Sequence, residues 1–383
     1  MVHFLNWRSQ ARALADALES SEDLRSPHWR AAIQDTPRHE FVPHYYQNQG
    51  GAPTVWRRVN ASDGPAWQDP IYTNATLVTH LDPTTMHAVE GGWIGTPSSS
   101  STAPSLMVRM LETLDIADDH TVLELGTGTG YNAALIAHRL RNAKQLTTAD
   151  IDPELTSTAR DRLQACGHTP TVLTCDASEH QWPRTYDRVV ATCGLPRINR
   201  SLRMAVAPGG RLIANVMPPL SVGLAVLTAD GEGNLQGHFH PDGGTFMAAR
   251  HDATTYARAT PGAPDVHREG EADVPLEAFD DYRFKFLLAA HLPGAELQYG
   301  TEGDRVMRRL VLPDGSSAEA QYEGVQPLSY RERGKREVWA IAARCWDWFE
   351  QNDRPGWERF GLTITYQDHH FWFESPDHIL TSF

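Results

Sequence analysis

The stretch Val122-Leu-Glu-Leu-Gly-Thr-Gly-Thr-Gly-Tyr-Asn-Ala-Ala134 decides how the rest of the chain can fold. Residues 122–125 are apolar apart from one acid, which is typical of a strand buried in a parallel sheet. Three glycines follow at alternate positions, and residues 131–140 then repeat apolar side chains at helical spacing. A strand, a glycine turn and a helix start can hold a nucleotide-like ligand, because glycine lets the backbone approach and the helix N-terminus offers free N–H groups.

The spacing of these glycines is informative. The dinucleotide-binding pattern is G-x-G-x-x-G, but here the third glycine comes one residue early, and Glu124 precedes the first by two. This E-x-G-x-G-x-G form resembles the first motif of S-adenosylmethionine-dependent methyltransferases. The resemblance implies that the acid faces the amino end of the cofactor's methionine. The alternative is an ordinary strand-to-helix turn, against which the acid, the flanking strand and the later motifs argue.

Length and composition set the class of protein. A chain of 383 residues can form two domains, or one domain with large additions. Hydrophobic content of 40% and charged content of 21% are those of a soluble globular protein. A net charge of -14 argues against a nucleic-acid partner, because phosphate binding relies on a positive face. The apolar runs are too short to span a bilayer and the start carries no signal pattern, so we expect a cytoplasmic protein without a membrane partner.

The four cysteines lie far apart and form no C-x-x-C pair. They are therefore predicted to be buried thiols, and neither a disulfide framework nor a zinc site. His238 and His240 could share one face of a strand as metal ligands, but no third ligand has suitable spacing. A surface hairpin is the better interpretation, and no metal is expected.

The N-terminal part carries two further motifs. Residues 1 to about 48 are helical in pattern until Thr36-Pro-Arg-His-Glu-Phe-Val-Pro43, where two prolines end the helix. This segment resembles the Pro-Arg-x-x-Phe-Val-Pro segment near the start of protein-L-isoaspartate O-methyltransferases. Residues 50–75 are expected to form a tethered loop. The stretch from Ile71 to Leu77 resembles the family's Tyr-x-Asp-x-x-Leu, with Asn74 where an Asp is usual.

Residues 81–101 form a polar, glycine-rich run that ends in four serines. Composition alone favours a disordered linker, whereas the residues that follow favour a ligand-contacting loop. Thr102 to Pro104 resembles the Thr-Ile-Ser-x-Pro segment that opens a helix in the same family, and alignment on Pro104 and Arg109 places the family's active-site serine on Thr102. The resemblance thus implies a catalytic group of Thr102, Ser101 and Ser100. It implies substrate contacts from Asn74, Ser98, Ser99 and Pro196.

From residue 121 onward, strands and helices alternate, which predicts a parallel sheet with crossover helices. Asp150 ends the second strand about 20 residues after the glycines, where a carboxylate suits the ribose hydroxyls. Asp152 competes for this role but has the position of a helix cap. Asp176 ends the third strand, and the resemblance places it at the adenine amino group. The predicted S-adenosylmethionine site comprises Glu124, Gly126, Thr127, Gly128, Gly130, Tyr131, Asp150, Ile151, Asp176, Ala177 and Thr192.

The chain after residue 200 is expected to complete this fold and then change character. A strand over 208–216 is followed by a strand pair near 220–228 and 244–249. Residues 251–270 have the composition of a linker. In the tail, 284–292 is a buried strand or a short helix. The remaining patterns predict a hairpin over 305–312 and 318–322, a helix over 335–351, and a last hairpin over 362–366 and 371–373.

Together these patterns predict an α/β protein. Its centre is a doubly wound, mostly parallel sheet of the Rossmann-like class I methyltransferase type, with an N-terminal helical extension and a C-terminal α+β addition. The expected divisions are an N-terminal helical and loop region over 1–80, the methyltransferase domain over 81–250, the linker, and a substrate-binding domain over 271–383. The aromatic tail could equally be packed for stability alone. A monomer is expected.

The resemblance covers roughly residues 30–250 and implies methyl transfer to a carboxylate. A carboxylate is already an anion, so holding it in line with the methyl group supplies most of the acceleration. The long aromatic tail is similar to actinobacterial homologues encoded with ribosomally made, modified peptides. These methylate an Asp of a macrocyclised precursor peptide, and the ester collapses to an aspartimide. The alternatives are repair of isoaspartate in damaged proteins and a cofactor- or peptide-binding protein without activity.

Overall fold

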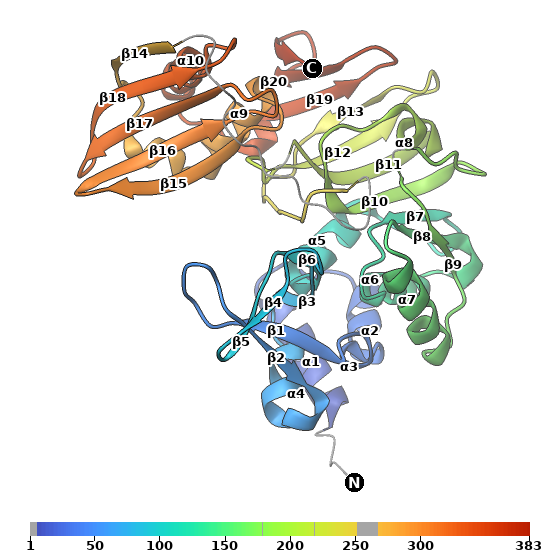
Figure 1. The fold of residues 1–383 in the computed structure, drawn as a ribbon. Helices are drawn as coiled ribbons and strands as arrows, with labels where there is room; N and C mark the ends of the chain where they lie inside the picture. The colour runs from blue at the N-terminus through green and yellow to red at the C-terminus, as the bar shows by residue number, and fades with distance from the viewer. Residues whose placement is uncertain (1–5, 178, 218, 251–266) are drawn as a thin grey trace. The chain divides into compact units, whose positions relative to one another are not determined.

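The computed structural model describes residues 6–177, 179–217, 219–250 and 267–383 (Figure 1). They divide into two compact units. The first comprises Met1–Thr192, Met204–Ile213 and Arg250–Thr255, and the second Cys193–Arg203, Ala214–Ala249 and Tyr256–Phe383. The chain passes between the two units several times from residue 192 onward, so neither unit is one continuous segment. Among the residues that the structure describes, no helix is long and apolar enough to cross a bilayer.

The first unit begins with the predicted helices, which stop at the two prolines. They are α1 (Trp7–Ser20), α2 (Pro27–Asp35) and α3 (Arg38–Phe41). The chain then forms an antiparallel sheet of six strands in the order β4-β5-β2-β1-β3-β6. Its elements are β1 (His44–Asn48), β2 (Trp56–Asn60), η1 (Ala61–Asp63), α4 (Pro65–Ile71), β3 (Leu77–Leu81), β4 (His87–Val89), β5 (Gly92–Ile94) and β6 (Pro97–Ser101). The prediction of loops over 50–75 and 81–101 is wrong here.

The same unit contains the predicted crossover fold. Strands β10, β7, β8 and β9 are neighbours in that order, and every pairing among them is parallel. The elements are α5 (Pro104–Leu114), β7 (Val122–Leu125), α6 (Tyr131–Arg139), η2 (Ala143–Gln145), β8 (Leu146–Asp150), α7 (Pro153–Ala165), β9 (Thr171–Thr174) and β10 (Tyr186–Leu195). The sequence prediction of a Rossmann-like centre is confirmed, and β7 is buried along its whole length.

The second unit begins with an antiparallel sheet. Strands β12, β13, β19, β20 and β21 are neighbours in that order. The elements are β12 (Leu224–Ala229), β13 (Leu235–His238), η4 (Trp357–Arg359), β19 (Phe360–Ile364), β20 (His369–Phe373) and β21 (Ile379–Ser382). Helix α8 (Arg200–Ala205) and strand β11 (Val206–Val216) are each divided between the two units. The partner of β12 is therefore β13 and not residues 244–249, of which Ala248 forms only an isolated bridge with Gly194. The last predicted hairpin is confirmed as β19 and β20.

A second sheet of five antiparallel strands completes this unit, in the order β14-β18-β17-β16-β15. Its elements are β14 (His267–Glu271), η3 (Leu276–Phe279), α9 (Tyr282–His291), β15 (Glu296–Glu302), β16 (Arg305–Val311), β17 (Ser317–Glu323), β18 (Gln326–Arg333) and α10 (Val338–Gln351). Helix α10 packs on β17, β18 and α9. Of the two possibilities for 284–292, the helix is correct. The predicted linker 251–270 lies outside the described residues as far as 266, and its last residues begin β14.

Candidate active site

The glycine loop after β7 depends on a backbone that other residues avoid. Gly126 has a φ of 91°, and its N–H donates to the Ala149 carbonyl at 2.8 Å. A Cβ at Gly126 would lie 2.7 Å from the Thr192 hydroxyl oxygen. That hydroxyl donates to the Gly126 carbonyl at 2.7 Å. The end of β10 thus fixes the loop and excludes any larger side chain, which places the predicted Thr192 beside the predicted glycines.

Asp150 connects the end of β8 to the same loop. One carboxylate oxygen accepts the Gly128 N–H at 2.9 Å, and the other accepts the Asp152 N–H at 3.2 Å. Burial raises the pKa of Asp150. A carboxylate accepts up to about four hydrogen bonds, so Asp150 keeps capacity for hydroxyl donors. Asp152 instead caps α7 by accepting the N–H groups of Glu154 and Leu155, as its sequence position indicated.

Glu124 lies inside the sheet, and its side chain has no exposed surface. Its oxygens accept from the Asn132 amide at 2.7 Å and from the Thr148 hydroxyl at 2.6 Å. Thr127 extends this network through a hydroxyl contact of 2.6 Å with Thr148. Burial raises the Glu124 pKa to about 7. The carboxylate therefore joins β7, β8 and α6, and its direct contact with a methionine remains a prediction.

The four serines form strand β6, which pairs with β3 and is not a linker or loop. Ser99 and Ser101 are buried, whereas Ser98 and Ser100 on the opposite face are half-buried, as strand alternation requires. A Cβ at Gly128 would lie 3.6 Å from the Ser99 hydroxyl oxygen. The strand therefore runs directly beside the glycine loop, and the predicted acceptor and cofactor residues come together.

Arg38 is a site residue that the sequence reasoning missed. Its guanidinium is fully buried and donates to the carbonyls of Ile71 at 2.8 Å and Ala75 at 3.1 Å. It also donates to the Ser101 hydroxyl and the Thr102 carbonyl, both at 3.1 Å. Burial lowers the Arg38 pKa to about 10. One side chain thus fixes the end of β6 against the 71–75 turn, and the available sequence signal was its place between two prolines.

Thr102 and Asn74 sit at the start of α5. Thr102 is half-buried, and its carbonyl is held by Arg38. Asn74 uses its side-chain oxygen to accept the Ser105 N–H at 3.0 Å, so it orients the first turn of α5. The nearby Thr76 hydroxyl accepts the Ala103 N–H at 3.0 Å. The catalytic role of Thr102 and the substrate role of Asn74 remain predictions, because these bonds are within the protein itself.

The other predicted site residues are distributed over the two compact units. Tyr131 is buried at the start of α6, and its ring lies 5.5 Å from the Arg38 guanidinium carbon. Asp176 and Ala177 are half-buried just after β9, and Ile151 is half-buried just after β8. All of these belong to the first unit, whereas Pro196 belongs to the second. Its predicted substrate contact therefore stays a prediction.

Comparison with known proteins agrees with this geometry. The model of the family described as Protein-L-isoaspartate(D-aspartate) O-methyltransferase (PCMT) matches residues 87–238, which include β6, the glycine loop and Asp150. This part of the chain is similar to the protein-L-isoaspartate O-methyltransferase family. The predicted enzyme class, a carboxyl O-methyltransferase that uses S-adenosylmethionine, is confirmed at the level of the family.

Individual proteins that are similar to this chain carry the name protein-L-isoaspartate O-methyltransferase. The protein-L-isoaspartate O-methyltransferase of Methanopyrus kandleri is 28% identical over 213 residues, which cover 55% of this chain and 78% of that protein. Protein-L-isoaspartate O-methyltransferase 2 of Archaeoglobus fulgidus is 26% identical over 61% of this chain and 89% of its own. A solved structure titled protein-L-isoaspartate O-methyltransferase has a TM-score of 0.53 at 16% identity. It covers 95% of this chain and 100% of its own, so the fold likeness includes the second unit.

The methyltransferase loop fits the cofactor that the family implies. Gly128 has a φ of 51°, which favours glycine, and the Asp150 carboxylate beside it keeps acceptor capacity for a ribose. The half-buried Asp176 lies after the next strand, where it can face an adenine. These residues would hold S-adenosylmethionine, which supplies an electrophilic methyl group on a sulfonium.

Proposed function

We propose that this methyltransferase transfers a methyl group to the side-chain carboxylate of an Asp in a ribosomally made, macrocyclised peptide. A carboxylate oxygen forms the new bond to the methyl carbon, and the carbon–sulfur bond breaks to leave S-adenosylhomocysteine. The next backbone nitrogen then attacks the ester carbonyl, loses its proton and releases methanol. The product is an aspartimide, and the protein need only make the ester.

The observation that carries the proposal is the position of β6 beside the glycine loop. The Ser99 hydroxyl oxygen lies within van der Waals contact of the space beside Gly128. Ser100 and Thr102 follow on the same segment, which Arg38 fixes through the Ser101 hydroxyl and the Thr102 carbonyl. Hydroxyl donors on a fixed strand can orient an anionic acceptor without a general base, which is what methyl transfer to a carboxylate requires.

Two departures from the family favour an Asp of a modified peptide as the acceptor. Thr102 stands where the family has its active-site serine, and Asn74 stands where an Asp is usual. Both changes are at the start of α5, next to the serine strand. A β-branched threonine has fewer rotamers than serine, so it suits one fixed acceptor better than many different damaged proteins.

Repair of isoaspartate is the second candidate. It is favoured by the names of the relatives in Methanopyrus kandleri and Archaeoglobus fulgidus. The solved isoaspartate methyltransferase covers 95% of this chain. An additional C-terminal unit therefore does not distinguish a peptide-tailoring enzyme from a repair enzyme, and only the acceptor can.

Three matched peptides decide between the candidates: a linear isoaspartyl peptide, its linear aspartyl form, and a side-chain-cyclised peptide with the same Asp. We expect fastest methylation of the cyclised peptide, followed by loss of methanol to a product one water lighter than the starting peptide. Faster turnover of the linear isoaspartyl peptide would establish repair instead. Methylation of none of them would favour a binding protein.

Thr102 provides a second test of the site. Thr102→Ala should lower kcat by about tenfold, because the hydroxyl that orients the acceptor is lost, whereas Thr102→Ser should retain activity. Thr113→Ala is the matched control, since that hydroxyl donates to the Arg109 carbonyl within the same helix. Unchanged turnover in Thr102→Ala would refute the role assigned to this residue.

A further inference from the structure

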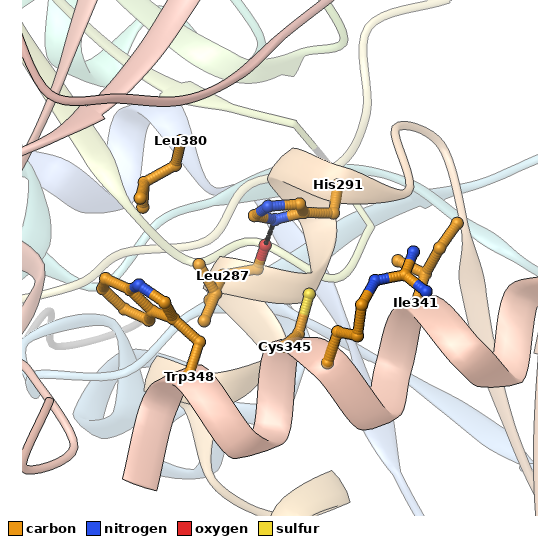
Figure 2. A pocket seen from close by; sticks show the side chains of 7 residues that line it. Leu287, His291, Ile341, Cys345, Trp348 and Leu380 are labelled. Atoms are coloured by element: carbon orange, nitrogen blue, oxygen red, sulfur yellow. Dashed lines mark hydrogen bonds between the residues drawn. The ribbon is translucent and has the colours of Figure 1, made fainter. Parts of the chain in front are cut away.

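The second unit contains a pocket of about 380 Å³ between α9, α10 and β21. Figure 2 shows Leu287 and His291 on α9, Cys345 and Trp348 on α10, and Leu380 on the opposite side. Most of its walls are apolar, and this volume lies within the range of small-molecule and side-chain pockets. All the lining residues belong to one unit, and all lie beyond residue 238, where the family match ends.

His291 gives the pocket one hydrogen-bond acceptor. Its Nδ1 donates to the Leu287 carbonyl at 3.0 Å, which is the dashed line in Figure 2. Burial lowers the His291 pKa, and the nearby Arg344 charge lowers it further, so the ring is neutral at physiological pH. The tautomer with hydrogen on Nδ1 leaves Nε2 as a lone pair that can accept from an N–H group.

Arg344 gives the pocket a cation. It is exposed on α10, one residue before Cys345, and also lines the pocket. Within the described residues, no carboxylate forms an ion pair with it. A second guanidinium, Arg336, donates to the His291 carbonyl at 3.5 Å. The charge that complements this pocket is therefore an anion.

The pocket has no nucleophile of its own. Burial raises the Cys345 pKa to about 12, so the thiol stays protonated and is neither a reactive group nor a metal ligand. Since the neutral His291 already spends its only ring N–H on Leu287, it has no proton to give a ligand. The arrangement is suited to binding and not to a second reaction.

From these groups we infer that the pocket binds the C-terminal residue of a peptide that ends in a large apolar side chain. The side chain lies between Leu287, Trp348 and Leu380, the free α-carboxylate pairs with Arg344, and the last backbone N–H donates to His291. One C-terminal residue carries all three of these groups within a few bonds, which matches partners on α9, α10 and β21. The inference builds on the proposed peptide substrate, which it would hold at a second point.

Calorimetry on the full chain tests this inference with acetyl-Gly-Gly-Phe and its C-terminal amide. The free acid should bind about tenfold more tightly than the amide, because a charge-assisted hydrogen bond is lost in the amide. Arg344→Gln should abolish that difference, while Arg331→Gln, an exposed arginine on β18, should preserve it. Arg344 is exposed, so its variant is expected to fold. Equal binding of acid and amide, or an unchanged preference in Arg344→Gln, would overturn the inference.

Kinetics separate this inference from the proposed function. The kinetic test uses a peptide that the protein methylates and that ends in Phe. Replacing its C-terminal carboxylate by an amide should raise KM about tenfold and leave kcat unchanged. Tight, carboxylate-dependent binding without methyl transfer to any peptide would leave the pocket established and contradict the proposed function. If the peptide is methylated with the same KM as free acid and as C-terminal amide, the inferred role of the pocket is wrong, whereas the proposed function stands.

Discussion

At the scale of single residues, Arg38 is a positioning residue with an unusual environment. It is buried, and its bonds go to carbonyl and hydroxyl oxygens of residues 71–75 and 101–102. Lysine has one ammonium and cannot reach this set of acceptors with a fixed planar fork. The carbonyls left without a donor would each carry a desolvation cost.

Arg38→Lys should therefore lower the free energy of unfolding by about 3 kcal/mol and reduce kcat. Chemical denaturation and steady-state kinetics at a temperature where the variant is still folded measure the two effects. Arg57→Lys, an exposed residue on β2 that donates to the Gln47 side chain, should change neither. A folded Arg38→Lys with full kcat would show that the end of β6 needs no such support.

Glu124 should make stability depend on pH. Its pKa of about 7 in the folded protein lies above the ordinary value of 4.5, because burial favours the neutral form. The protonated Glu124 therefore stabilises the folded protein fully at pH values below its pKa in the unfolded chain. This stabilisation is lost as pH rises through its pKa in the folded protein. Glu124→Gln stays neutral throughout, and Asn132 can turn its amide so that its buried, unbonded oxygen accepts from the new amide.

Relative to the native protein, Glu124→Gln should be equally stable near about pH 5 and more stable near about pH 8, by up to about 3 kcal/mol. Denaturation curves across this range give the difference, in which other titrating groups cancel. Glu90→Gln, an exposed control, should give a flat difference. If the stability of Glu124→Gln relative to the native protein fell as pH rises, the pKa of Glu124 would be lowered in the folded protein and not raised.

At the scale of elements, two glycines allow the cost of backbone strain to be measured apart from the cost of a steric clash. One is Gly126, in the turn from β7 to α6, and the other is Gly167, after α7. Gly126 and Gly167 both have positive φ, of 91° and 82°. Alanine costs about 1 kcal/mol in such a backbone. A Cβ at Gly126 would also collide with the Thr192 hydroxyl, whereas no atom lies within 4 Å of a Cβ at Gly167.

Gly126→Ala should thus lower the affinity for S-adenosylhomocysteine at least about tenfold, because the loop or the end of β10 must move. Gly167→Ala should show the backbone cost alone, as a small fall in melting temperature with unchanged affinity. Calorimetry and thermal unfolding of both variants make the comparison. Equal affinity in the two variants would mean that the loop does not hold the cofactor.

The elements also show what a sequence can predict. Strands β7, β8 and β9 were predictable because short runs of apolar and threonine residues lead to Gly or Asp, and Asp150 could be placed from that pattern. Strand β6 was not, since serine has low strand propensity and only pairing with β3 makes it a strand. Arg38 was missed because its acceptors lie more than thirty residues away and meet only in the folded chain.

At the scale of the whole molecule, the family match and the structural units end at different places. The match stops at residue 238, but β13 in the second unit pairs with β19, where Leu235 lies opposite Ile364. Phe239 packs its ring 4.7 Å from Phe286 and 6.0 Å from Phe371. Strands before residue 250 therefore complete their packing only with strands after residue 360.

A chain that ends at residue 250 should consequently aggregate, although it contains the whole matched segment. It would expose the buried Leu235 and Phe239 and leave β13 with an unpaired edge. Size-exclusion chromatography and thermal unfolding of the 1–250 chain test this against the full-length protein. Co-expression of 251–383 as a separate chain should restore a soluble complex that binds S-adenosylhomocysteine. A monomeric 1–250 chain that unfolds cooperatively would instead make the C-terminal part an independent appendage.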